Sequence, residues 1–181
     1  LLVVDHATAR HHDAVVNVLE IVELQGIRLT SDELSIGAAS TFTDIRRSPD
    51  VAKHARMLID AAATIGAAQI QNRATIVGNI CNASPAADGV PPLLTLDAVV
   101  EIASRQGMRR EPMAQFIDAY RHTTLAPQEL VTGLRIPKQS GAGHFRKLGA
   151  RRYLVISIAM VAGIFDLDEQ GKVKSAKVEP T

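Results

Sequence analysis

Residues 75–88, Thr-Ile-Val-Gly-Asn-Ile-Cys-Asn-Ala-Ser-Pro-Ala-Ala-Asp, are the stretch that decides how this chain is interpreted. They combine small side chains, amides and hydroxyls with one carboxylate, Asp88, at the end. Such a segment has little bulk and many hydrogen-bonding groups, and Gly78 gives its backbone the freedom to approach a polar or polyanionic ligand closely. We predict a loop here. Its composition is equally compatible with ligand binding and with a tightly packed turn between helix and sheet.

The composition describes an ordered and nearly neutral protein. The chain has 181 residues, a hydrophobic fraction of 46% and a mean hydropathy of +0.08, which excludes a disordered tail. Twenty Lys and Arg residues against nineteen Asp and Glu residues leave a formal charge of +1, so no nucleic-acid surface is expected. No apolar run reaches membrane-spanning length, and no signal peptide is visible.

The single cysteine, Cys81, limits the chemistry that the chain can support. One thiol forms neither a disulfide framework nor a multi-thiolate metal site, and it favours a reducing compartment, which we take to be the cytoplasm. No signature joins Cys81 to a base, so we interpret it as a packing residue rather than a nucleophile. The six histidines lack H-E-x-x-H spacing, and the chain also lacks the G-x-S-x-G, G-x-G-x-x-G and P-loop signatures.

Hydrophobic periodicity and turn residues predict short helices alternating with strands. The clearest helix is expected over residues 51–65, where apolar residues recur at steps of four and three and form one face. Thr41 and Asp44 have the spacing of a capping box. The other expected elements are a strand at 14–21, a hairpin of 27–30 with 34–38, a short helix at 91–96, a hairpin of 98–104 with 108–111, a helix at 112–120, and strands at 130–136, 145–148, 157–166 and 172–178.

These elements predict an α+β fold, with a small mixed or antiparallel sheet flanked by helices, rather than a doubly wound sheet. The pattern changes after residues 137–143, which we take as a domain boundary. The chain is therefore expected to contain one domain at 1–140 and the start of a second α+β domain at 141–181. Lys147 lies in a predicted strand after this boundary, and we expect a solvated cation there unless the fold turns it inward.

Several side chains of the 75–88 stretch are suited to phosphate and sugar oxygens. The hydroxyl of Thr75 and the amides of Asn79 and Asn82 can donate hydrogen bonds to such groups. Asp88 has two interpretations: it accepts a hydrogen bond from a ribose hydroxyl, or it caps the helix expected to begin near Val90.

The order of these residues resembles the FAD-binding subunit of the molybdenum hydroxylases, the family of xanthine dehydrogenase and carbon monoxide dehydrogenase. That family has a Thr/Ser-hydrophobic-Gly-Gly-Asn turn followed by an Ala-Ser-Pro segment and an Asp. Here the turn is T-I-V-G-N at 75–79, and the segment is A-S-P-A-A-D at 83–88. Further matching segments, in the same order, are I-G-A at 36–38, E-L-V at 129–131, I-P at 136–137 and F-R-K-L-G-A-R-R at 145–152.

The resemblance implies an oxidoreductase subunit whose domain at 1–140 holds FAD. It implies a molybdopterin-binding large subunit and an iron–sulfur small subunit as partners, with electrons passing from the clusters through the flavin to an external acceptor such as NAD. No side chain is expected to act as a general acid or base. The cofactor-binding residues that it implies are Ile65, Thr75, Ile76, Val77, Gly78, Asn79, Asn82, Ser84, Asp88, Val131 and Lys147.

The chain departs from the family pattern in two places. Val77 stands where the family has a glycine, and an A-G-G-T-D segment expected just before Leu1 is absent. We therefore expect a fragment that binds FAD weakly by itself. These departures leave open a non-catalytic assembly module of the same fold that no longer holds flavin. A stand-alone FAD oxidase of the vanillyl-alcohol oxidase type is disfavoured by the A-S-P-x-x-D segment and by the lack of a covalent flavin-attachment motif.

Overall fold

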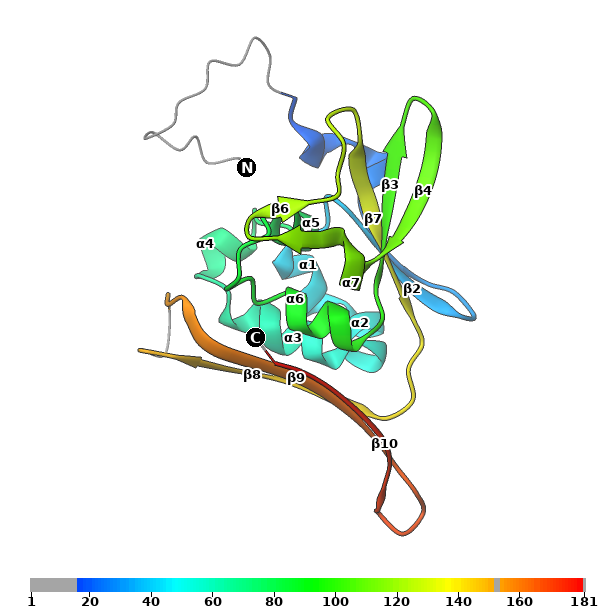
Figure 1. Ribbon diagram of the computed structural model, residues 1–181, viewed down its shortest axis with the longest axis vertical. Coiled ribbons are helices and arrows are strands. Elements are labelled where there is room, and N and C mark those ends of the chain that lie inside the picture. The colour runs from blue at the N-terminus through cyan, green and yellow to red at the C-terminus, as the bar shows by residue number, and fades with distance from the viewer. Residues whose placement is uncertain (1–15, 152–153, 181) are drawn as a thin grey trace.

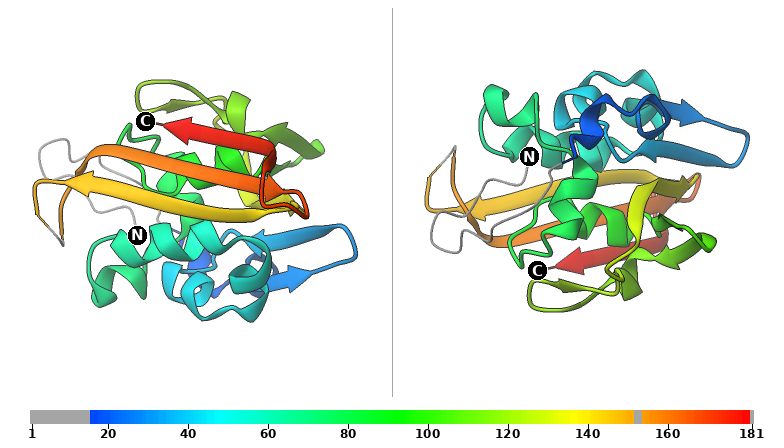
Figure 2. Two further views of the ribbon diagram at one scale, coloured as in Figure 1. Left: turned by 90° about the horizontal axis from the view of Figure 1, so that it is seen from below. Right: turned by 90° about the horizontal axis from the view of Figure 1, so that it is seen from above.

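The computed structural model describes residues 16–151 and 154–180, and its elements are arranged in layers (Figure 1). A five-stranded antiparallel sheet lies on one side, short helices lie in the middle, and a three-stranded antiparallel sheet lies on the other side (Figures 1 and 2). This combination is the α+β fold that the sequence predicts, and all paired strands described are antiparallel.

The five-stranded sheet has the strand order β1-β2-β7-β3-β4. It confirms the two predicted hairpins, because β1 pairs with β2 and β3 pairs with β4. In the first hairpin the hydroxyl oxygen of Thr30 accepts a hydrogen bond from the Glu33 N–H at 3.1 Å, which closes the turn. The strands are β1 (Ile27–Leu29), β2 (Glu33–Gly37), β3 (Val99–Ser104), β4 (Gly107–Pro112) and β7 (Leu130–Pro137).

The three-stranded sheet has the order β10-β9-β8 and is formed entirely by residues after the predicted boundary. The turn between β9 and β10 is held by Asp168, whose carboxylate accepts from the Lys172 N–H at 2.8 Å. The strands are β8 (Ala142–Gly149), β9 (Ser157–Leu167) and β10 (Val173–Pro180); a separate pair is formed by β5 (Ile117–Ala119) and β6 (His122–Thr123).

The helices are short and several are capped by their own sequence. Thr41 and Asp44 form the predicted capping box at the start of α1. No helix in the described residues is long and apolar enough to cross a membrane. The helices are η2 (Val18–Glu20), η3 (Val22–Leu24), α1 (Phe42–Arg47), α2 (Pro49–His54), α3 (Arg56–Thr64), α4 (Ala68–Gln71), α5 (Ile76–Cys81), α6 (Val90–Thr95) and α7 (Met113–Phe116).

One hydrophobic core joins both sheets through the helical layer. It contains Leu134 of β7, Leu58 of α3, Leu93 of α6 and Phe145 of β8, each at most 2% exposed. Helix α3 packs on β8, and α6 packs on β9 and β10. The inner face of the three-stranded sheet therefore packs against α3 and α6, which belong to the same core as the five-stranded sheet. The division of the chain into two domains near 137–143 stays a prediction.

The predicted strand at 14–21 is wrong over its described part, residues 16–21. Residues 18–20 form the 3-10 helix η2, because the Asn17 side chain accepts a hydrogen bond from the Leu19 N–H at 3.2 Å and caps the turn. The local bond of an asparagine side chain to the backbone here overrides the strand preference of the β-branched residues that surround it.

The predicted helix at 51–65 is two helices, α2 and α3, separated at Ala55 with φ −146° and ψ 46°. The first begins earlier than expected, because Ser48 caps it through the Val51 N–H and Pro49 occupies its first position. Ala55 closes α2 by donating its N–H to the Val51 carbonyl, and its own carbonyl accepts from the Leu58 N–H. The apolar period survives the break because both helices face the same core.

Two further predictions need correction. Residues 75–88 are not a loop throughout, because α5 occupies their first half. The predicted helix at 112–120 is only the four-residue α7, and the chain then enters β5, where Ile117 pairs with Thr123 of β6. The short helix predicted to begin with Pro91 and Pro92 is confirmed as α6.

Candidate functional site

The first turn of α5 forms one part of the candidate site. Thr75 precedes the helix, and its hydroxyl oxygen accepts a hydrogen bond from the Gly78 N–H at 2.9 Å. The side chains of Ile76 and Val77 are 1% and 6% exposed, whereas Gly78 is exposed. Because the first N–H groups of a helix have no acceptor within it, the groups that this turn can offer to a ligand are backbone N–H groups and the Thr75 hydroxyl.

The burial of Val77 explains how a valine is accommodated in this turn. Its side chain belongs to the hydrophobic core, so it takes no space on the outer surface of α5. Gly78 occupies an outward position, and a Cβ added there would lie 3.1 Å from the Thr75 hydroxyl oxygen. The turn therefore keeps a glycine at the position where a side chain would crowd its capping group.

Asn79 connects the two ends of the 75–88 stretch. Its side-chain oxygen accepts a hydrogen bond from the N–H of Gly89 at 3.1 Å. Gly89 is buried, and a Cβ added there would lie 2.7 Å from this oxygen. Asn79 thus has a structural task through its oxygen, and its amide nitrogen remains for a ligand.

Asp88 and Lys147 form a buried ion pair with a hydroxyl partner. Lys147 Nζ lies 2.7 Å from Asp88 Oδ2, and the Ser157 hydroxyl donates to Asp88 Oδ1 at 2.6 Å. The Asp88 and Lys147 side chains are only 8% and 9% exposed. The fold therefore turns Lys147 inward from β8, and Asp88 makes an ion pair rather than capping α6, which shows no side-chain cap.

The residues between α5 and Asp88 form turns, with a left-handed residue near their start. Ala83 has φ +46° and is buried, and its carbonyl accepts from the Arg121 N–H at 3.1 Å. Asn82 is exposed, and the Ser84 hydroxyl oxygen accepts from the Ala86 N–H at 3.3 Å. The structure thus places Asn82 at the surface and Ser84 partly inside the turn.

Cys81 ends α5 and is exposed, so the structure does not place it in the core as the predicted packing residue. Partial burial of its thiol nevertheless raises the thiol pKa to about 11. The thiol is therefore protonated at neutral pH, whereas a nucleophilic cysteine reacts as the thiolate.

Two of the implied residues lie away from this cluster or inside the core. Val131 in β7 is 2% exposed, so its side chain packs in the core. Ile65 follows α3 and is half-buried, and its carbonyl accepts from the Gln71 side chain at 2.8 Å. The structure thus links α5 to the Asp88 region through the Asn79–Gly89 hydrogen bond and Asp88 to Lys147 through the ion pair, whereas the Val131 side chain lies in the core.

Ser157 binds Asp88 in the candidate site, and the sequence did not predict it. It lies 69 residues after Asp88, and no local motif connects them. Strict alternation along β9 would put Ser157 on the face opposite to Met160, whose side chain is buried. Only a strand irregularity can bring it to the inner face, and the sequence carries no clear signal for that.

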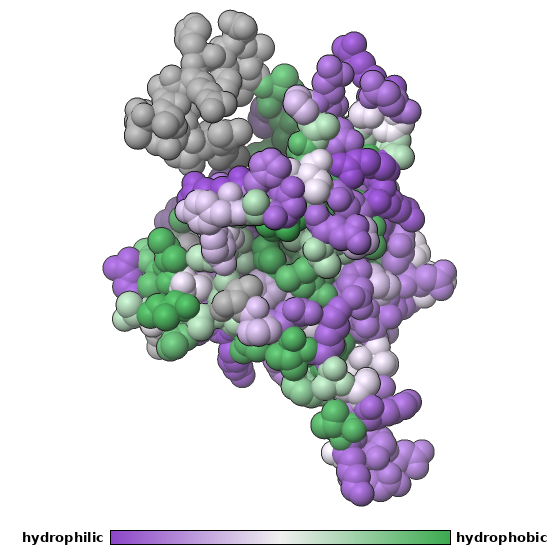
Figure 3. All heavy atoms as spheres, viewed as in Figure 1, coloured by the Kyte–Doolittle hydropathy of each residue, from purple (hydrophilic) through white to green (hydrophobic). Residues whose placement is uncertain are grey.

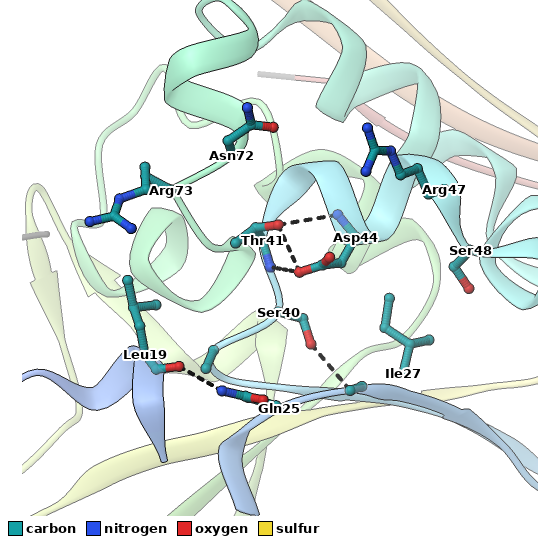
Figure 4. Close-up of a pocket in the computed structure, with 12 residues that line it drawn as sticks. Leu19, Gln25, Ile27, Ser40, Thr41, Asp44, Arg47, Ser48, Asn72 and Arg73 are labelled. Atoms are coloured by element: carbon teal, nitrogen blue, oxygen red, sulfur yellow. Dashed lines mark hydrogen bonds between the residues drawn. The ribbon is translucent and has the colours of Figure 1, made fainter. Parts of the chain in front are cut away.

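Two cavities open near the candidate site, and the smaller one shares residues with it. The larger, of about 650 Å³, lies beside α1 and is drawn in Figure 4. There Arg47 and Arg73 lie on either side of the Thr41–Asp44 capping box, and neither has an ion pair among the described residues. The smaller cavity, of about 430 Å³, is mainly apolar and includes Ser84 and Tyr120.

Among residues 16–151 and 154–180, no group of His, Cys, Asp and Glu side chains is arranged to hold a metal ion.

Figure 3 shows hydrophilic atoms over the β3–β4 hairpin and over the tip of the β9–β10 hairpin. The three-stranded sheet and its connections carry exposed apolar side chains, namely Leu148, Ile156, Ile158, Phe165 and Val178.

A family model described as the FAD binding domain in molybdopterin dehydrogenase matches residues 1–139. The nicotinate dehydrogenase FAD-subunit of Eubacterium barkeri is 36% identical over 164 residues, which are 88% of this chain and 55% of that relative. A putative xanthine dehydrogenase FAD-binding subunit of Escherichia coli is 36% identical over 137 residues, covering 73% of this chain and 47% of the relative.

Solved structures of other oxidoreductases have the same fold. A chain of reconstituted CO dehydrogenase from Oligotropha carboxidovorans superposes with a TM-score of 0.84 at 26% identity, covering 88% of this chain and 56% of that one. Quinoline 2-oxidoreductase from Pseudomonas putida gives a TM-score of 0.82 at 25% identity, over 87% and 55%. The chain thus spans about half the length of the relatives that it matches.

Proposed function

Because this chain belongs to the family of FAD binding domains in molybdopterin dehydrogenases, we propose that it is the flavin-holding part of a molybdenum hydroxylase complex. A molybdopterin-binding large subunit hydroxylates the substrate, and an iron–sulfur small subunit carries the electrons to this chain. An external acceptor, such as NAD, then removes them. Bound FAD supplies the redox chemistry, and the protein binds and orients it.

The observation that carries the proposal is the position of a buried cation close to an exposed turn rich in donors. Lys147 uses one of its three N–H donors on Asp88, and no other described group accepts from it. The first turn of α5 adds backbone N–H groups, and Asn79 and Asn82 add side-chain amides. A cation and neutral N–H donors suit an anionic diphosphate and the negative charge that a flavin gains on reduction.

The residues then have separate tasks. Thr75 to Asn79 hold the diphosphate, with the side chains of Ile76 and Val77 anchoring the turn in the core. Asn82, Ser84 and Asp88 lie alongside the cofactor. Lys147 places a positive charge next to it, and Ile65 and Val131 supply apolar support.

Burial of Val77 weakens the alternative of an assembly module that no longer holds flavin. That alternative rested on two departures from the family pattern, and the first of them, a valine in the turn, is accommodated because the side chain is 6% exposed and belongs to the core. For the same complex we propose a cytoplasmic location, which the lone cysteine of the sequence favours.

The visible spectrum of the purified full-length subunit tests this function. We expect oxidised-flavin absorption with about one FAD per chain, and co-purification of the two partner subunits. Substrate added to the complex should bleach this absorption, and NAD or another acceptor should restore it. A folded full-length subunit that stays colourless after incubation with excess FAD would support the assembly module instead.

A further inference from the structure

The arrangement around Asp88 contains a residue whose task the proposed function leaves unexplained. The two carboxylate oxygens of Asp88 have different donors: Lys147 Nζ binds Oδ2 at 2.7 Å, and the Ser157 hydroxyl binds Oδ1 at 2.6 Å. Asp88 is 6% exposed, so water has little access to replace either donor. A carboxylate held at both oxygens cannot rotate freely, whereas one donor alone would leave it free to turn.

A β-bulge brings Ser157 to this position. Leu148 of β8 pairs with Ala159, but the next residue, Gly149, pairs with Ser157, so Ile158 is an extra residue in β9. Without this insertion, alternation would direct Ser157 away from Lys147, whose partner on β9 is Met160. Bulges of this kind re-aim a side chain, and they are frequent next to functional sites.

The bulge carries a local cost that packing does not offset. Ile158, the extra residue, is 68% exposed and therefore buries little apolar surface. What the irregularity achieves is the placement of one hydroxyl on the inner face of the sheet, within hydrogen-bonding distance of a buried carboxylate. This supports a task for Ser157 beyond sheet formation.

We propose that Ser157 is a positioning residue for the flavin site, acting through Asp88 on Lys147. The hydroxyl fixes the plane of the Asp88 carboxylate, and the carboxylate fixes the Lys147 ammonium at 2.7 Å. The two remaining N–H donors of Lys147 are then held in constant directions. This inference depends on the proposed function, because it takes FAD to be the group that these donors and this positive charge address.

The test uses the full-length subunit in its complex, with FAD affinity, the two-electron midpoint potential of bound FAD and the melting temperature as measurements. Ser157→Ala removes the hydroxyl, and Ser157→Thr keeps it. Ser157→Cys keeps the side-chain volume with a weak donor, and it decides the question if the alanine variant does not fold. Ser140→Ala is the matched control, because it removes an exposed hydroxyl–carboxylate bond to Asp166, 3.2 Å long, beside the same sheet.

We expect Ser157→Ala to weaken FAD binding about tenfold, as for one lost hydrogen bond to a charged group, and to shift the potential to more negative values. The shift is negative because a less firmly placed positive charge favours the added electrons less. Ser157→Thr should restore both values, Ser157→Cys should be intermediate, and Ser140→Ala should change neither.

A lowered melting temperature in Ser157→Ala or Ser157→Cys, with affinity and potential as in the wild type, would overturn the positioning role and leave a structural bond. A threonine variant that melts like the wild type but keeps the altered potential would also overturn it. A wild-type subunit that binds no FAD refutes the proposed function itself, and this inference with it.

Discussion

Two ion-pair clusters among the described residues differ in their exposure to water, and we expect them to differ in their contribution to stability. On the five-stranded sheet, Glu101 binds both Arg110 and Arg135, at 2.9 and 2.7 Å, with arginine side chains 60% and 28% exposed. Between the helices and the second sheet, Asp88 and Lys147 are 8% and 9% exposed. Exposed pairs are screened by water and contribute little to the free energy of unfolding, whereas a buried charge that loses its partner lowers this free energy strongly. Similar distances therefore do not imply similar energies.

The largest effect is expected from Lys147→Met, which leaves the Asp88 carboxylate buried with only the Ser157 hydroxyl as a donor. Breaking a buried pair in this way costs about 3–5 kcal/mol of unfolding free energy. Urea unfolding of the FAD-free full-length subunit measures it. Lys174→Met is the matched control, since Lys174 is exposed on β10 and has no ion pair among the described residues. A loss no larger than that of the control would remove the distinction between the clusters.

An intermediate effect is expected from Asn79→Ala, because it leaves the buried Gly89 N–H without its acceptor. An unsatisfied buried donor costs about 1–3 kcal/mol. Asn79→Asp keeps an acceptor oxygen, so it should retain the unfolding free energy of the wild type more closely. It should nevertheless weaken FAD binding, because it adds a negative charge beside an anionic diphosphate. Equal FAD affinity in the wild type and the aspartate variant would argue against diphosphate binding at this turn.

The sequence predicted those parts of the fold that short-range chemistry decides. The hairpin around residues 31–33, the hairpin around 105–107 and the Thr41–Asp44 capping box all follow from residues close together in the chain. The break at Ala55 was not predictable in this way. The apolar period runs through it unchanged, and only the packing of α2 and α3 against one core requires the break.

The candidate site shows the same limit. The turn at 75–79 could be found from its pattern, but the pattern did not show that the side chains of Ile76, Val77 and Val131 face the core. Ser157 could not be found at all, because a bulge in β9 reverses the alternation on which its placement would be judged.

A smaller effect, visible only in acid, is expected from Glu129. The hydrogen-bonded Arg109 side chain, at 2.6 Å, lowers the pKa of Glu129 from 4.5 to about 2. A carboxyl with a lowered folded-state pKa contributes stability that is present above the unfolded value and is lost as the pH falls through the folded value. The unfolding free energy should therefore decrease between pH 4.5 and 2. In Arg109→Met this decrease should be smaller, and an identical pH profile for both proteins would contradict the assignment.

The smallest effect is expected from Arg110→Ala. Its side chain is 60% exposed, and Glu101 keeps a second partner when it is removed, because Arg135 Nε lies 2.7 Å from the other carboxylate oxygen. The loss should stay within about 0.5 kcal/mol of unfolding free energy.

Arg135→Ala provides the contrast on the same face. It removes the one ion-pair partner that Glu33 has among the described residues and one of the two partners of Glu101, whose side chains are 29% and 12% exposed, so it should cost more than Arg110→Ala. Urea unfolding at low and high salt separates the two, because added salt screens the exposed Arg110 pair most. If Arg110→Ala costs as much as Lys147→Met, exposure does not govern the energies of these pairs, and the contrast between the two clusters fails.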